Sequence, residues 1–109
     1  MQIGEIVEKL GLTVLVGEDL TAEVTGGYVA DLLSCVIAGA KPQDLWVTLQ
    51  THVNIVAVAS LKEVAGIVVA ESAVVPAATL EKAAQQGVVM LSSSQPVYET
   101  VKQLVALGL

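Results

Sequence analysis

Polar side chains of several types crowd residues 48–54, which read Thr-Leu-Gln-Thr-His-Val-Asn. This stretch ends a predicted buried strand and leads into a predicted helix, and open α/β sheets bind ligands beyond the carboxyl ends of their strands. The candidate ligand-binding residues here are Gln50, Thr51, His52 and Asn54. Imidazole serves acid–base chemistry near neutral pH, and a helix start capped by Thr51 would present free N–H groups to an anion. The alternative, in which Thr51 only caps the helix, Asn54 closes a turn and His52 is an ordinary surface side chain, is equally compatible with the pattern.

A second candidate site is the Thr25-Gly26-Gly27 segment, with Asp31 a few residues further on. Two adjacent glycines allow positive φ or the close approach of a ligand or another backbone. We expect a turn here between a strand and a helix, with Asp31 in the first helical turn. The simpler interpretation is a glycine turn followed by a solvated carboxylate that favours the helix dipole.

Three serines, at residues 92–94, follow another predicted strand and precede a helix. The hydroxyls of Ser92 and Ser93 are candidate ligand contacts at the same carboxyl edge as His52. Serines in this position more often belong to a loop or cap the next helix.

Constellations typical of enzymes are largely missing from the chain. Neither common phosphate-binding glycine motif is present, and one histidine with one cysteine offers no metal-ligating cluster. Cys35 falls near the apolar stripe of its predicted helix, where a small buried hydrophobic residue is expected. The sequence therefore predicts no catalytic residues, no metal and no cofactor, and an enzyme that uses His52 would need a partner group that the pattern does not identify.

The composition is aliphatic and acidic. Hydrophobic residues make up 54% of the chain and aromatic residues 3%, and the net charge of −6 includes five lysines and no arginine. This charge balance argues against binding to nucleic acid, and no apolar run is long enough to cross a bilayer. No signal peptide is evident, so we expect the cytoplasm.

Segments with helical hydrophobic periodicity alternate with short apolar strands along residues 1–109. We interpret this pattern as one α/β domain with a mostly parallel sheet. The expected helices cover residues 3–10, from 29 to about 38–41, 54–63, 77–86 and 96–107. The expected strands cover residues 13–16, 21–25, 45–49, 66–70 and 88–91. Gly11 and Gly87 are predicted helix C-caps.

The run at residues 53–59 is apolar on all sides, which a helix on a sheet surface satisfies only when it is covered on more than one side. We expect a second subunit to provide that cover. The candidate dimer contacts are Ile55, Val58 and Ala59.

The chain resembles the DRTGG domain family over essentially its whole length. The resemblance rests on segments 24–29, 31–34, 45–52 and 54–59, although Glu23-Val24 stands where the family motif has Asp-Arg. It implies a three-layer α/β sandwich like the N-terminal domain of HPr kinase/phosphorylase. It also implies an accessory role in dimerisation or regulation, because the domain is not the catalytic part of the larger proteins in which this family occurs.

Together, these features predict a free-standing, non-catalytic regulatory and dimerisation domain that acts in trans on a metabolic enzyme or kinase. The alternative is a sensor domain for a nucleotide or phosphate, with its site at the carboxyl edge of the sheet. The residues expected to build that site together are Thr25, Gly26, Gly27, Gln50, Thr51, His52 and the serines at 92–94.

Overall fold

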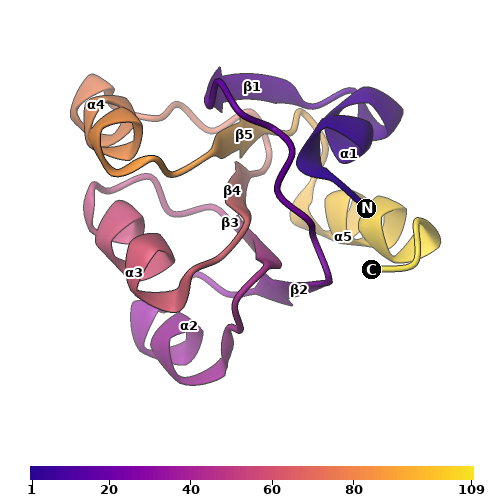
Figure 1. The fold of residues 1–109 in the computed structure, drawn as a ribbon, viewed down its shortest axis with the longest axis horizontal. Helices are drawn as coiled ribbons and strands as arrows, with labels where there is room; N and C mark the ends of the chain where they lie inside the picture. The colour runs from indigo at the N-terminus through magenta and orange to yellow at the C-terminus, as the bar shows by residue number, and fades with distance from the viewer.

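The computed structural model describes residues 1–109 as a five-stranded sheet with helices on both faces (Figure 1). The strands are β1 (Thr13–Val16), β2 (Gly26–Val29), β3 (Asp44–Thr48), β4 (Gly66–Val69) and β5 (Met90–Ser92). The helices are α1 (Ile3–Leu10), α2 (Leu33–Gly39), α3 (Asn54–Lys62), α4 (Ala77–Gln86) and α5 (Val97–Ala106). The predicted α/β sandwich is confirmed.

The sheet has the strand order β1-β5-β4-β3-β2. The four strands from β2 to β5 pair in parallel, and β1 joins β5 in the antiparallel sense. Parallel neighbours require crossover connections, and each is made here by a helix. The carboxyl ends of β2, β3, β4 and β5 consequently share one edge of the sheet.

Each face of the sheet carries its own hydrophobic core. Helices α1 and α5 cover one face, and α2, α3 and α4 cover the other (Figure 1). Successive strand residues alternate between the two cores, so Leu45 and Val47 face the first and Trp46 faces the second. The Trp46 indole is fully buried, and its Nε1–H donates to the carbonyl of Ala30 at 2.9 Å.

Several predicted helix ends are confirmed by their geometry. Gly11 and Gly87 cap α1 and α4 in the left-handed conformation, with φ of 64° and 68°. Helix α4 has the predicted bounds, and α3 ends one residue earlier than expected. The spacing of apolar residues, together with a C-terminal glycine, was sufficient to locate α1 and α4.

The prediction of a strand at residues 21–25 and a glycine turn at 25–27 is wrong. Residues 21–25 form only an isolated bridge, between Gln2 and Glu23, while Gly26 and Gly27 belong to strand β2. Strand β2 pairs in regular register with β3, from Gly26 opposite Asp44 to Val29 opposite Val47. The expected helix therefore starts later, at Leu33, because Tyr28 and Val29 are held in the sheet.

Helix α3 does not need a second subunit to bury its apolar residues. It is the middle helix of three, packed between α2 and α4 over the sheet. The side chains of Ile55, Val58 and Ala59 are 0%, 7% and 1% exposed within a single chain. These three candidate dimer contacts are therefore part of the internal core, because neighbouring helices cover the sides that we expected a partner to cover.

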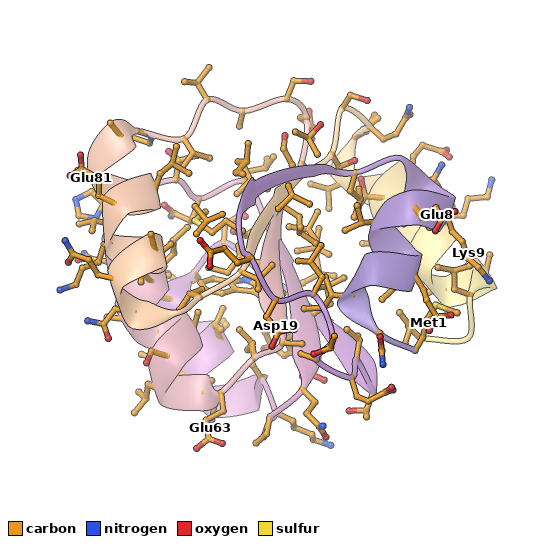
Figure 2. All side chains as sticks on the ribbon, turned by 45° about the horizontal axis from the view of Figure 1, so that its top comes forward. Met1, Glu8, Lys9, Asp19, Glu63 and Glu81 are labelled. Carbon is orange, nitrogen blue, oxygen red and sulfur yellow. The ribbon has the colours of Figure 1, made fainter.

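Charged side chains other than Asp44, which is buried, lie at the surface. Glu8 and Lys9 of α1, Glu81 of α4 and Glu63 after α3 point away from the sheet (Figure 2). The amino group of Met1 pairs with Glu23 at 2.8 Å, which fastens the start of the chain to the segment before β2. None of the helices combines the length and the apolar character that crossing a bilayer requires.

Candidate functional site

The carboxyl edge of the sheet brings Asp31 to the end of β3. Asp31 lies in the loop between β2 and α2, ahead of the helix in which we expected it. Its Oδ1 accepts hydrogen bonds from the Thr48 hydroxyl at 2.9 Å and from the Leu49 N–H at 2.8 Å. The Thr48 Oγ1 in turn accepts from the Gln50 N–H at 3.0 Å. This carboxylate therefore links the ends of two neighbouring strands.

His52 lies at the start of α3, and its ring supports the backbone there. The Nδ1 atom accepts a hydrogen bond from the Asn54 N–H at 3.1 Å, which leaves Nε2 on the exposed side chain without a protein partner. Thr51 does not cap the helix as expected, since the N-cap position is Val53 without a side-chain bond. Instead, the Thr51 carbonyl accepts from the buried Thr79 hydroxyl of α4 at 2.7 Å.

The serines after β5 are engaged within the protein. Ser93 is buried, its Oγ is 2.8 Å from the Thr100 Oγ1, and it accepts the Gln95 N–H at 3.1 Å. Because Thr100 donates to the Pro96 carbonyl at 3.0 Å, the Ser93 hydroxyl is the donor in the pair of hydroxyls. Ser93 thus shapes the turn into α5, and Ser92, half-buried, is the last residue of β5.

Thr25, Gly26 and Gly27 lie at the opposite end of the sheet from His52. Gly26 is opposite Asp44, at the amino ends of two parallel strands, so the predicted grouping of these residues with the carboxyl-edge residues is wrong. The three residues line an open hollow of about 430 Å³ whose one cationic side chain is Lys41. A Cβ on Gly26 would lie 2.9 Å from the Asp44 Oδ1, so a larger residue would displace this carboxylate, whose Oδ2 accepts the Lys41 N–H at 2.8 Å.

A third feature, an apolar groove between β2, β3 and α5, was not found from the sequence. Its volume is about 130 Å³. The lining residues are Gly26, Gly27, Tyr28, Val29, Leu45, Val47, Val101, Leu104, Val105 and Leu109. The sequence does contain a signal for it. The spacing of Val101, Leu104 and Val105 puts them on one face of α5, and this face has one apolar residue more than the core uses, because Val105 is 60% exposed.

The chemistry open to these side chains is limited. No three side chains among His, Cys, Asp and Glu are grouped so that they could hold a metal ion. Cys35 is exposed, contrary to expectation, because α2 buries Val36 and turns Cys35 outward. Hydrogen bonds from the side chain and then the backbone of Thr21 lower the pKa of Asp19.

Comparison with known proteins gives a fold rather than a family. No protein-family model matches the chain, and no curated protein matches it. Among solved structures, it is similar to the CBS and DRTGG domains of the regulatory region of Clostridium perfringens pyrophosphatase, in complex with the activator diadenosine tetraphosphate. The TM-score is 0.76 at 12% identity, over 94% of this chain and 45% of that chain. The chain therefore has a DRTGG-like α/β fold and spans less than half the length of its structural neighbour.

Proposed function

We propose that this domain is a non-catalytic regulatory module that works as a homodimer in the cytoplasm and acts in trans on a metabolic enzyme. The observation that carries the proposal is the state of its polar groups. Asp31, Thr48, Ser93 and Thr79 all use their oxygen atoms to hold the protein together, so no nucleophile is paired with a base. Among the surface hollows, the small groove beside β2 is the one whose lining side chains are all uncharged and mostly apolar.

The structural neighbour supports this proposal through its fold. That protein uses the fold in a regulatory region of a metabolic enzyme rather than in a catalytic site. Aliphatic residues exposed beside an otherwise acidic surface favour self-association, since burial of apolar surface is the main driving force for assembly.

Light scattering over a dilution series tests the dimer. We expect a particle of twice the chain mass of 11.2 kDa at micromolar concentration. A particle of one chain mass throughout that range would remove the homodimer from the proposal.

A small-ligand sensor is the second candidate function. It is favoured by the exposed His52 Nε2 beside Gln50 and Asn54, and by the activator nucleotide bound in the structural neighbour. Lys41 in the hollow at the amino end offers a competing anion site.

A thermal-shift panel of diadenosine tetraphosphate, ATP, acetyl phosphate and coenzyme A separates these sites. A ligand at 100 times its Kd adds about 2.7 kcal/mol of stability, a shift of about ten degrees or more. Loss of that shift in His52→Ala would assign the carboxyl edge, and loss in Lys41→Gln would assign the hollow. A flat panel would exclude these four ligands and favour the regulatory dimer over the sensor.

A further inference from the structure

The two edges of the sheet are protected differently. At the β1 edge the ladder is irregular, with a register shift between Val14 and Val16. At the other edge, β2 pairs with β3 without any shift and consists of Gly-Gly-Tyr-Val, with no charged residue and no proline. Charges, prolines and bulges are the usual means by which proteins prevent edge strands from pairing with other chains. Strand β2 has none of these features.

Hydrogen-bond alternation identifies which groups of β2 are free. Thr48 accepts from the Ala70 N–H, so Thr48 directs its backbone groups toward β4. Its neighbour Val47 therefore points to β2, where it bonds to the residues that flank its register partner Val29. Val29 itself, and Gly27 two residues before it, must direct their N–H and C=O groups outward. The edge thus presents two donors and two acceptors without partners in this chain.

Gly27 has no explanation within the chain. Its φ is not positive, and an added Cβ would meet only the Leu45 carbonyl oxygen, at an ordinary contact distance of 3.5 Å. Glycine weakens a strand and commonly marks a point at which another backbone or a ligand comes close. Gly26, in contrast, lies where an added Cβ would collide with the Asp44 carboxylate. The chain therefore contains a glycine whose benefit must come from outside it.

Apolar side chains surround this edge. Two of the large hydrophobic side chains that are exposed, Val29 of β2 and Val105 of α5, line the groove beside it. No charged residue lines the groove beside β2, although the chain carries a net charge of −6. Two acidic copies repel each other least where the facing surfaces are uncharged. A basic partner, in contrast, would be attracted by acidic residues, and this groove has none.

We propose that β2 pairs in antiparallel fashion with β2 of a second copy, about a two-fold axis at Tyr28, to form a continuous ten-stranded sheet. This register places Gly27 opposite Val29 of the second copy, and Val29 opposite the second copy's Gly27. All four outward groups on each chain then find a partner, and each valine side chain lies beside a position without a side chain. The inference rests on the proposed homodimer and specifies where it forms.

Matched lysine variants test the location by light scattering. Val29→Lys puts a charge into the proposed interface, and we expect the dimer Kd to rise roughly a hundredfold or more. Val74→Lys makes the same change at an exposed valine outside the groove and should leave the dimer intact. Both valines are exposed in the single chain, at 47% and 86%, so both variants should fold.

Gly27→Val provides an independent test that adds no charge. An added Cβ makes only an ordinary contact at 3.5 Å, and valine favours strands over glycine. The melting temperature of the isolated chain should therefore be kept or raised, while the dimer weakens roughly tenfold or more. If the wild type is a dimer and Val29→Lys and Gly27→Val dimerise equally well, this inference is overturned and the proposed homodimer stands. If the wild type is a monomer, the homodimer fails as well. A wild-type monomer whose Val29 and Gly27 resonances shift on addition of an unrelated extended peptide would assign the edge to a different partner and overturn the pairing of two copies.

Discussion

Gly39→Ala should destabilise the domain although helix propensity alone predicts the opposite sign. Gly39 is the last residue of α2, and the Tyr28 side chain of β2 packs directly against it. A Cβ at this position would lie 2.5, 2.6 and 2.8 Å from the Tyr28 OH, Cε1 and Cζ atoms. The ring would therefore have to move, and its hydroxyl would lose the 2.9 Å hydrogen bond to the Cys35 carbonyl.

The size of the effect follows from three terms. Overpacking costs about 1–3 kcal/mol, and the lost hydrogen bond costs about 1 kcal/mol. Replacing glycine by alanine in a helix returns at most about 1 kcal/mol. The net loss is about 1–3 kcal/mol, which corresponds to a fall in melting temperature of about 5–20 °C for a domain of this size.

Thermal and urea denaturation of Gly39→Ala in the wild-type and Tyr28→Ala backgrounds test this prediction. In the wild-type background Gly39→Ala should lower the melting temperature. In a Tyr28→Ala background the collision is absent, so the same change should raise it by the propensity term alone. An increase of similar size in both backgrounds would refute the packing argument.

Three further predictions concern single contacts. Trp46→Phe should cost about 2 kcal/mol in urea unfolding, because it removes the Nε1–H donor to Ala30 and leaves unfilled volume in a fully buried site; an unchanged midpoint would contradict this. Thr79→Val should cost about 1 kcal/mol because it removes the hydroxyl bonded to the Thr51 carbonyl, and Thr79→Ser, which keeps the donor, serves as the control. Because hydrogen bonds from Thr21 lower the pKa of Asp19, this carboxylate stabilises the fold above its unfolded pKa of about 3.9, and the contribution is lost as the pH falls through the lower folded pKa. In an NMR titration, Thr21→Val should raise the pKa of Asp19 toward its ordinary value, and an unchanged pKa would show that the Thr21 hydroxyl is not the cause.

Local patterns in the sequence were enough to predict most of the helices and the parallel core. Ile3 and Ile6 mark the buried face of α1, and Gly11 and Gly87 end their helices in the left-handed conformation. These features depend on contacts between residues close in sequence, so periodicity and cap chemistry reveal them.

Strand β2 could not be predicted, because its conformation depends on its neighbour. Two adjacent glycines have low strand propensity, and only the ladder to β3 holds them extended. Once these residues were taken for a turn, Thr25–Gly27 were assigned to the wrong end of the sheet.

The candidate site was limited by long-range contacts in the same way. The bond from Thr48 to Asp31 joins residues 17 positions apart, and the bond from Thr79 to Thr51 joins residues 28 apart. No local pattern showed that these polar groups were already engaged. The sequence of α3 was ambiguous for a similar reason. A helix that is apolar on all sides is expected both when neighbouring helices cover it, as α2 and α4 do, and when a partner subunit covers it.

The most direct test of the regulatory homodimer is residue-specific amide hydrogen exchange along β2. The exchange is measured by NMR at protein concentrations above and below the dissociation constant of the dimer. We expect the outward N–H groups of Gly27 and Val29 to be protected in the concentrated sample and to exchange rapidly on dilution. The Tyr28 N–H, which faces β3, should be protected in both samples and serves as the internal control. Rapid exchange at Gly27 and Val29 at every concentration would contradict a dimer formed through this edge.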